Sequence, residues 1–271
     1  MHQLLVYMNG EWVEEEKASI SINNPGFTSA RVVYETIRTY NNELFRFKKH
    51  YNRLANSADA MKMLLNITSE EMEQIIRAGI AKNRLDEAYI RIYLTSNPDL
   101  IIQIKDFPEK DPIIYETGVL TDISEVRRQA FMHNKTAIKT TAALDVFLSR
   151  IKKPNHLYDF IMLNREGYVA EGTFSNVFVV KDDVLITPSM ETGILSGITR
   201  ELVIELSQKC HINCEQRLVE EKELFEADEL FLTHTSGGIV PIKALSHKKY
   251  QIGEITLQLI SALEAFTGNH D

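Results

Sequence analysis

The stretch that decides the fold is EGTFSNVFVVKDDVLITPSMETGILSGITR, residues 171–200. It opens with a carboxylate, Glu171, at a small polar turn, and two apolar segments around Asp182-Asp183 predict a strand hairpin. Residues 195–200 then lead into an amphipathic helix that begins after Gly197. Because the first turn of a helix offers unpaired N–H groups and a positive dipole end, such a start favours a bound phosphate. The stretch therefore indicates a ligand that has a basic ring and a phosphate tail.

Composition narrows the class of protein. The chain has 271 residues, of which 44% are hydrophobic, and this is enough for one large domain or two small ones. Its formal net charge of −8, without a block of Lys or Arg, argues against nucleic-acid binding. The two cysteines, Cys210 and Cys214, lack the further ligands of a zinc site, so we expect no metal and a reducing compartment. No signal peptide or membrane-length apolar segment stands out, which predicts a soluble cytoplasmic protein.

Strand-like and helix-like patterns follow one another along the chain. An Asn-Gly turn at residues 9–10 predicts a hairpin, and Thr68 with Glu71 predicts a capped helix that runs to about Asn83. Further strands are expected near residues 32–40, 43–47, 88–95, 100–104, 114–120, 136–140, 158–163, 176–180, 184–187 and 229–232, and further helices near 48–65, 142–153, 198–210, 220–226 and 253–267. Elements that interleave in this way predict an α/β fold with mixed sheets. The charged segment 106–112 leads us to expect a smaller domain over residues 1–115 and a larger one over residues 116–271.

Two residues could carry chemistry at the basic ring of the ligand. Lys139 lies among small neutral residues, where partial desolvation would favour the neutral amine that forms Schiff bases, although most lysines are exposed. Glu171 could pair with a protonated ring nitrogen, or it could belong to an ordinary surface turn.

Arg91, on a strand with Tyr89, could hold a substrate carboxylate, or it could form a salt bridge between domains.

Other residues could bind the phosphate. The amides of Ile198 and Thr199 lie at the expected helix start, where a plain helix cap is the alternative. Arg53 could donate to a phosphate, or it could be a solvated helix arginine. The Thr/Ser/Gly loop 233–238 follows a strand and could form an anion-binding nest or an ordinary turn.

Taken in this order and spacing, these residues resemble the signature of the class IV (fold type IV) pyridoxal-phosphate aminotransferases. That family includes branched-chain and D-amino-acid aminotransferases and aminodeoxychorismate lyase. The positions that match the signature are Glu171, Thr173, Asn176, Val177, Phe178, Leu185, Thr187, Leu195, Gly197, Ile198 and Arg200. A pattern of this length is far more specific than a single glycine motif. The resemblance extends from about residue 7 to residue 241, and it implies a smaller N-terminal and a larger C-terminal α/β domain.

The resemblance also implies a role for each candidate. Lys139 falls at the Schiff-base lysine, and Glu171 falls at the carboxylate that keeps the pyridine nitrogen protonated. The positions that bind the cofactor phosphate or contact its ring are Arg53, Leu195, Gly197, Ile198, Thr199 and Thr235. The positions that line the substrate pocket are Tyr34, Tyr89, Arg91, Ser236 and Gly237.

The implied reaction is amino-group transfer between an amino acid and a 2-keto acid, with Lys139 as both covalent anchor and general base. The loop 236–241 lacks the acidic residue of many family transaminases and looks closer to many lyases. The alternative is therefore aminodeoxychorismate lyase, which forms 4-aminobenzoate and pyruvate, and a third is a pyridoxal-phosphate carrier without turnover. The resemblance further implies a homodimer. The native substrate, its stereochemistry and the role of His234 stay open.

Overall fold

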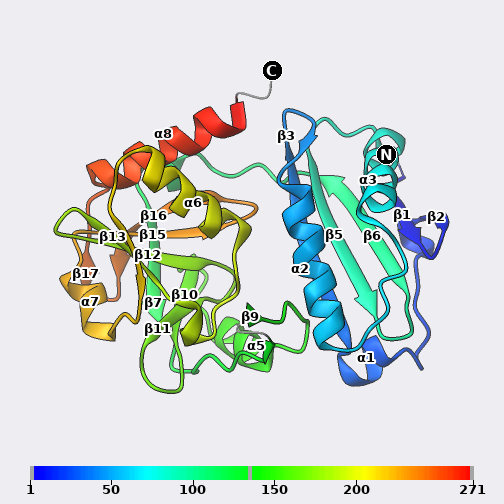
Figure 1. Ribbon diagram of the computed structural model, residues 1–271, viewed down its shortest axis with the longest axis horizontal. Helices are drawn as coiled ribbons and strands as arrows, with labels where there is room; N and C mark the ends of the chain where they lie inside the picture. Colours follow the sequence, from blue (N-terminus) through cyan, green and yellow to red (C-terminus); the bar gives the residue numbers. More distant parts are fainter. Residues whose placement is uncertain (1–2, 134–135, 269–271) are drawn as a thin grey trace. The chain divides into compact units, whose positions relative to one another are not determined.

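The computed structural model describes residues 3–133 and 136–268. The chain divides into two compact units, shown with their elements in Figure 1. Unit 1 contains the residues up to Glu109 together with the segment Ile138–Ala142, and unit 2 contains Lys110–Ala137 and residues 143–268. The domain boundary expected between residues 115 and 116 stays a prediction. No sequence pattern indicated that residues 138–142 would belong to the first unit.

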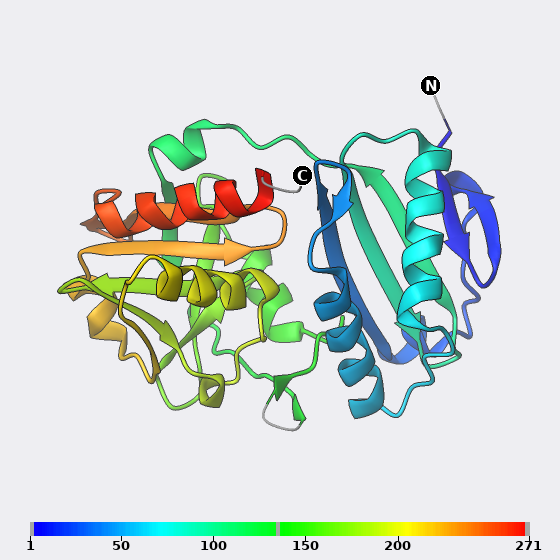
Figure 2. The ribbon, with the colours of Figure 1, turned by 45° about the horizontal axis from the view of Figure 1, so that its top comes forward.

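Unit 1 is built on one antiparallel sheet with the strand order β2-β1-β6-β5-β3-β4. Its strands are β1 (Leu5–Met8), β2 (Glu11–Glu14), β3 (Val32–Tyr40), β4 (Glu43–Leu44), β5 (Ala88–Thr95) and β6 (Leu100–Asp106). Helices α2 (Phe47–Ala60) and α3 (Ser69–Asn83) lie along one face of this sheet, as Figures 1 and 2 show. The predicted Asn-Gly hairpin is confirmed as β1–β2, and the predicted Thr68/Glu71 capping box is confirmed at α3.

Alternation along β3 gives the sheet two different faces. Val33, Glu35 and Ile37 are fully buried, and the two apolar residues belong to the core that α2 and α3 cover. Tyr34 points to the other face, because side chains alternate along a strand. The register pairs it with Tyr93 of β5, and the next pair on that face joins Thr36 with Arg91. The sheet therefore presents Tyr34, Tyr93 and Arg91 together on the face away from the helices.

Local residues set the start of one helix and the end of one strand in unit 1. Asn24 is the N-cap of helix α1 (Pro25–Ser29), and its side chain accepts a hydrogen bond from the Gly26 amide at 2.6 Å. Asparagine before proline is a favourable helix start. The strand expected over residues 43–47 ends at Leu44, because Arg46 adopts the left-handed conformation as the N-cap of α2.

Unit 2 contains a mixed sheet with the strand order β11-β10-β7-β16-β15-β12-β13-β14, and β17 pairs with β16. The strands are β7 (Val119–Ile123), β10 (Asp159–Leu163), β11 (Val169–Gly172), β12 (Asn176–Lys181), β13 (Val184–Pro188), β14 (Cys214–Arg217), β15 (Glu229–His234), β16 (Gly238–Leu245) and β17 (Lys248–Lys249). A separate short pair joins β8 (Met132–His133) and β9 (Thr136–Ala137). Parallel pairing occurs between β7 and its neighbours β10 and β16, which confirms the mixed-sheet prediction.

The helices of unit 2 are α4 (Ile113–Glu116), α5 (Leu144–Ile151), α6 (Ile198–Lys209), α7 (Glu221–Glu226) and α8 (Glu254–Gly268). Helices α6 and α8 pack on each other and along β15 and β16, as Figure 2 shows. A strand was expected over residues 114–120, which is wrong for its first half because residues 113–116 form α4. The positive φ of Gly118 separates that turn from β7. The strand expected over 136–140 ends at Ala137.

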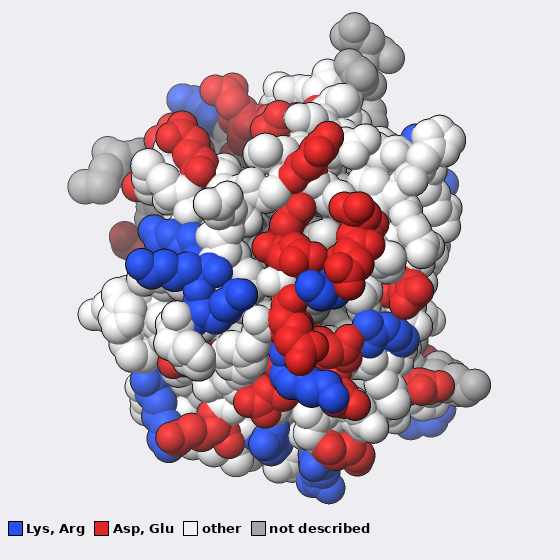
Figure 3. All heavy atoms as spheres, turned by 90° about the vertical axis from the view of Figure 1, so that its left-hand side faces the viewer, with Lys and Arg blue, Asp and Glu red and all other residues white. Residues whose placement is uncertain are grey.

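The surface of unit 2 is rich in acidic side chains. Figure 3 shows the face on which α7 lies, where Asp and Glu side chains form a broad band interrupted by smaller groups of Lys and Arg. Two acidic residues at α7 form ion pairs, since Glu223 contacts Arg217 at 2.6 Å and Glu220 contacts Lys222 at 2.7 Å. Across the part of the chain that the structure describes, no helix has the length and apolar character needed to span a bilayer.

Candidate active site

The Lys139 segment runs antiparallel to β3 and is joined to it by an isolated bridge between Thr140 and Val33. The Tyr34 amide donates to the Lys139 carbonyl at 3.1 Å, and the Thr141 amide donates to the Val32 carbonyl at 3.2 Å. On the other side, the Lys139 amide donates to Oγ of Ser57 in α2 at 3.2 Å. Because both backbone polar groups of Lys139 are used, the direction in which its side chain leaves the backbone is fixed.

Two cations lie close to one tyrosine ring on the face of the unit 1 sheet away from its helices. Lys139 Nζ lies 4.5 Å from the centroid of Tyr34, and Arg91 Cζ lies 5.0 Å from the same centroid. Tyr93 stacks on Tyr34 at 6.3 Å and also contacts Arg91. Among the described residues, Arg91 Nε is buried and has no hydrogen-bond partner. The face is thus suited to an anionic ligand.

Arg53 belongs to a buried ionic cluster, so the alternative of a solvated helix arginine is wrong. Its side chain is 9% exposed, and it makes two hydrogen bonds to Glu35 of β3, from Nε at 2.6 Å and from Nη2 at 2.8 Å. His50, one turn earlier on α2, contacts the same carboxylate through Nδ1 at 2.9 Å. Although burial acts to raise the pKa of Glu35, the Arg53 charge holds it well below its usual range. The guanidinium is therefore fixed from the core side, and the sequence did not indicate Glu35 or His50 as its partners.

Glu171 lies at the end of β11 and is almost completely buried. Its Oε1 accepts a hydrogen bond from Nε of Arg128 at 2.8 Å, and its Oε2 accepts one from the Leu195 amide at 2.9 Å. Asn176 Nδ2 donates to the Leu195 carbonyl at 3.1 Å. The alternative of an ordinary surface turn is wrong for Glu171, because this carboxylate ties β11 to the segment that begins α6.

The turn that follows Glu171 is held by a second buried carboxylate. Asp159 of β10 is fully buried and accepts hydrogen bonds from Thr173 Oγ1 at 2.6 Å and from Ser175 Oγ at 2.7 Å. A Cβ atom added at Gly172 would lie 2.4 Å from the Asp159 carboxylate, so glycine is needed there. Burial raises the pKa of Asp159. Gly172 and the signature residue Thr173 therefore position the turn around Glu171.

The start of α6 has the features of an anion site. Its N-cap is Gly197, which has no side chain to cap the first amides, and Ile198 and Thr199 are buried in the first turn. A Cβ atom at Gly197 would lie 2.0 Å from Asn176 Oδ1, so any other residue would have to displace the Asn176 side chain. Thr199 is the second helical residue, and the choice between a phosphate site and a plain helix cap stays a prediction. Arg200 points away from this end and donates to Pro188 and Gln216, both at 3.0 Å, so it joins α6 to the sheet.

A loop that contains Thr235, Ser236 and Gly237 follows β15. Its residues contact the ring of His234. The His234 ring contacts Ser236 Oγ through Nδ1 at 3.1 Å and the Tyr158 hydroxyl through Nε2 at 2.8 Å. A Cβ atom at Gly237 would lie 2.4 Å from that ring. Burial lowers the pKa of His234 to about 3, so the ring is neutral near pH 7. His234 therefore supports the loop as a neutral hydrogen-bonding residue, a contact that the sequence left open.

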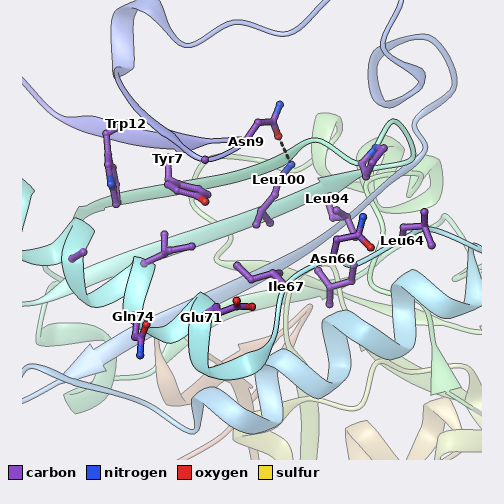
Figure 4. Close-up of a pocket in the computed structure, with 15 residues that line it drawn as sticks. Tyr7, Asn9, Trp12, Leu64, Asn66, Ile67, Glu71, Gln74, Leu94 and Leu100 are labelled. Carbon is purple, nitrogen blue, oxygen red and sulfur yellow. Dashed lines mark hydrogen bonds between the residues drawn. The ribbon is translucent and has the colours of Figure 1, made fainter.

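Two other features carry no candidate chemistry. A cavity of about 710 Å³ in unit 1, shown in Figure 4, lies on the helix-covered side, where Trp12, Leu94 and Ile75 line it, and none of the candidate residues does. Cys210 and Cys214 are free thiols at the end of α6 and the start of β14. Within residues 3–133 and 136–268, no group of three or more His, Cys, Asp or Glu side chains is arranged to hold a metal ion.

The candidate residues thus form two groups. Lys139, Arg53, Tyr34, Tyr89 and Arg91 belong to unit 1. The remaining candidates belong to unit 2, and these are Glu171, Leu195, Gly197, Ile198, Thr199, Thr235, Ser236 and Gly237. Within each unit the structure connects members that are distant in sequence.

Comparison with known proteins decides the family. The model of the family described as amino-transferase class IV matches residues 32–245, which is most of the chain. The chain belongs to the class IV aminotransferase family. The resemblance stated from the sequence is thereby confirmed, as is its implication that the protein is an aminotransferase.

Individual relatives support this assignment over the full length. A protein of Thermotoga maritima, named as a probable branched-chain-amino-acid aminotransferase, is 38% identical over 98% of this chain and 97% of its own. A D-alanine aminotransferase of Staphylococcus epidermidis is 28% identical over 98% of both chains. Among solved structures, the T.th. branched-chain amino acid aminotransferase complexed with N-(5′-phosphopyridoxyl)-L-glutamate has a TM-score of 0.87 and 25% identity, and the match covers 99% of this chain and 95% of that one.

Pyridoxal phosphate is the cofactor of this class IV aminotransferase. The residues present fit that group. The α6 start offers amides without a side-chain cap to the phosphate, Glu171 is a buried carboxylate suited to the ring nitrogen, and Lys139 offers an amine held on a fixed backbone. The chemistry of this donor set is what a phosphorylated pyridine aldehyde requires.

Proposed function

We propose that this class IV aminotransferase transfers the amino group between branched-chain L-amino acids and 2-keto acids. The observation that carries the proposal is the 38% identity to the Thermotoga maritima protein, which extends over 98% of this chain. The ligand of the solved T.th. enzyme is an L-glutamate derivative, which supports the L configuration and glutamate as an amino-group donor. The stacked rings of Tyr34 and Tyr93 are compatible with contact to an aliphatic substrate side chain.

In this proposal Lys139 is the catalytic residue. Its amine would hold the cofactor's aldehyde, and in its free, neutral form it would act as the base for the proton on the substrate Cα. The hydrogen bonds to Tyr34 and Ser57 hold the Lys139 backbone, so that the side chain can return to the same position in each half-reaction. When bound, pyridoxal phosphate supplies the aldehyde and a ring that withdraws electrons from Cα.

The other candidates have binding roles. Glu171 is assigned to the ring nitrogen of the cofactor, and Leu195 to contact with its ring. The phosphate is assigned to Arg53 together with residues that offer backbone amides or hydroxyls, namely Gly197, Ile198, Thr199 and Thr235. The residues assigned to substrate binding are Tyr34, Tyr89, Arg91, Ser236 and Gly237. Among these, Arg91 is assigned to the substrate carboxylate, because it carries the positive charge. The buried, unpaired Nε of Arg91 supports that last assignment.

A panel of amino acids tests the reaction and its substrate. Without a keto acid, we expect L-leucine, L-isoleucine and L-valine each to change the absorbance band of the bound cofactor in a single turnover and then to stop reacting. When 2-oxoglutarate is added, we expect the same amino acids to react continuously. D-alanine serves as the stereochemical comparison and aminodeoxychorismate as the comparison for lyase chemistry. Continuous pyruvate release from aminodeoxychorismate without a keto acid, with no response to branched-chain L-amino acids, would contradict the proposal.

We further propose that the enzyme is a cytoplasmic homodimer. Helix α5 exposes a row of apolar side chains at helical spacing, which are Leu144, Phe147, Leu148 and Ile151. Phe147 is 58% exposed and Ile151 is 67% exposed. The apolar face of a helix in a soluble protein is normally buried, so exposure of several of its residues marks a contact surface. A second copy of the chain is the occupant that the family resemblance implies, because isologous dimers cover such patches on both subunits.

Charged substitutions on α5 test the dimer. The Phe147→Asp/Ile151→Asp variant is expected to elute with half the mass of the native protein in size-exclusion chromatography with light scattering, because each charge would have to be buried at the interface. Leu257→Asp on α8, which replaces another exposed apolar residue, is the matched control and is expected to keep the native mass. An unchanged mass for the α5 variant would contradict the proposed interface.

A further inference from the structure

Three charged side chains of unit 2, Glu171, Arg128 and Asp145, form a row in which Arg128 lies between the two carboxylates. Arg128 donates from Nε to Glu171 Oε1 at 2.8 Å and from Nη1 to Asp145 Oδ2 at 2.7 Å. The side chain of Arg128 is 12% exposed, and those of both carboxylates are 7% exposed. Because solvent barely reaches these groups, their mutual interactions are screened far less than those of surface ion pairs. The negative charge of Asp145 therefore contributes to the electrostatic potential at Glu171.

The row is held by its backbone surroundings as well as by its charges. The Arg128 amide donates to the Leu163 carbonyl of β10 at 2.8 Å, which fixes the loop that carries the guanidinium. Asp145 lies in the first turn of α5, and its Oδ2 also accepts the Gln129 amide at 2.7 Å. An acidic residue in the first turn is favoured by the helix dipole. Asp145 is thus anchored by a helix start and by the loop next to Arg128.

The net charge of the row is −1. Although burial acts to raise it, the Gln129 amide and the Arg128 charge lower the pKa of Asp145. Burial acts to lower the pKa of Arg128, but Glu171 and Asp145 raise it. Arg128 alone would cancel the charge of Glu171 and leave little attraction for a cation. Asp145 restores one negative charge to the group that ends at Glu171.

We propose that Asp145 is a positioning residue that, through Arg128, makes the Glu171 carboxylate able to hold a protonated ring nitrogen of pyridoxal phosphate. This inference rests on the proposed assignment of Glu171 to that nitrogen. Arg128 fixes the orientation of the Glu171 carboxylate, and Asp145 compensates the positive charge that this orientation requires. Neither residue touches the cofactor in this account, and both act through Glu171.

The test compares the affinity of the apoenzyme for two cofactors. Pyridoxal phosphate is one, and its 1-deaza analogue, in which a C–H group replaces the ring nitrogen and cannot be protonated, is the other. The ratio of the two dissociation constants isolates the contribution of the charged nitrogen, because a general loosening of the site weakens both ligands alike. The variants are Asp145→Asn and Asp145→Ser, which are neutral, Asp145→Glu, which keeps the charge, and Glu125→Gln, an exposed residue of the same loop region.

We expect the neutral variants to reduce the preference for pyridoxal phosphate about tenfold, which corresponds to about one unit in the pKa of the ring nitrogen. Asp145→Glu is expected to restore most of the preference, and Glu125→Gln to leave it unchanged, because its carboxylate is 86% exposed. Should Asp145→Asn fold poorly in a thermal melt, Asp145→Ser answers the same question, since serine also accepts a hydrogen bond at a helix start.

Glu171→Gln separates this inference from the proposed function. If Glu171→Gln abolishes the preference while the neutral Asp145 variants keep it, the inference is overturned and the role of Glu171 stands. A preference that survives in Glu171→Gln would overturn the assignment of Glu171 itself, and with it the inference. Equal weakening of both cofactors in the Asp145 variants would identify a purely structural role for Asp145, which also overturns the proposal.

Discussion

Replacement of Lys139 by alanine is expected to lower the rate of amino-group transfer by at least about 10⁴-fold, since a general base alone contributes about 10²–10⁴ and the covalent attachment is lost as well. The fold should survive, because the contacts that hold this segment use the backbone of Lys139, and alanine keeps the hydrogen bonds to Tyr34 and Ser57. The absorbance band of the lysine-bound cofactor should disappear, while thermal unfolding of the apoprotein should stay near that of the native protein.

Lys152→Ala is the matched control, because Lys152 is an exposed lysine of unit 2 with a surface partner at 3.4 Å. Borohydride reduction followed by peptide mapping should place the cofactor on Lys139 in the native protein and in the control. A Lys139→Ala protein that keeps the band, with the reduced cofactor on another lysine, would refute the assignment.

Glu171→Gln is expected to lower kcat by about 10²–10³-fold, the range found when one preorganised electrostatic contact to a reacting group is removed. Glutamine keeps the shape of the side chain, but its single carbonyl oxygen can accept only one of the two hydrogen bonds that the carboxylate accepts from the Leu195 amide and Arg128. The backbone of the Leu195 segment should hold, because Asn176 still donates to the Leu195 carbonyl. Cofactor affinity should change much less, by about tenfold or below, since the phosphate contacts are untouched.

The measurement for this variant is a single-turnover rate with L-leucine alongside a dissociation constant for pyridoxal phosphate. Glu125→Gln, which removes an exposed carboxylate, is expected to leave both quantities unchanged. Equal losses in rate and in cofactor affinity would contradict an electronic role for Glu171 and would leave only a binding role.

The sequence predicted elements wherever the signal is local. The capping box at Thr68 and Glu71 and the Asn-Gly hairpin depend on residues a few positions apart, and both are confirmed. β16 was not predicted, because Pro241 within it is a typical strand breaker, yet it pairs opposite Phe231. The strand expected over residues 114–120 was wrong in its first half, because the apolar residues of the short helix α4 show no helical period in the sequence.

The candidate site shows the same difference between local patterns, which the sequence reveals, and long-range contacts, which it does not. Motif residues such as Glu171 and Gly197 are recognisable from spacing, but their charged partners are not. Arg128 precedes Glu171 by 43 positions, and no local pattern predicts a contact across that separation. Glu35 and Arg53 are closer, but they meet only because β3 and α2 pack together. Pairing between buried charges is a tertiary property, so a single sequence could not supply it.

The short segment Ile138–Ala142 has a consequence for how the chain is made. Its pairing completes the outer edge of β3, where the Tyr34 amide and the Val32 carbonyl otherwise have no strand beside them. During synthesis on the ribosome, the first unit leaves the exit tunnel with this edge uncovered until some thirty further residues have emerged. An uncovered edge is a template for pairing with other chains, so a stalled nascent chain whose emerged part ends between residues 109 and 138 should be prone to aggregation.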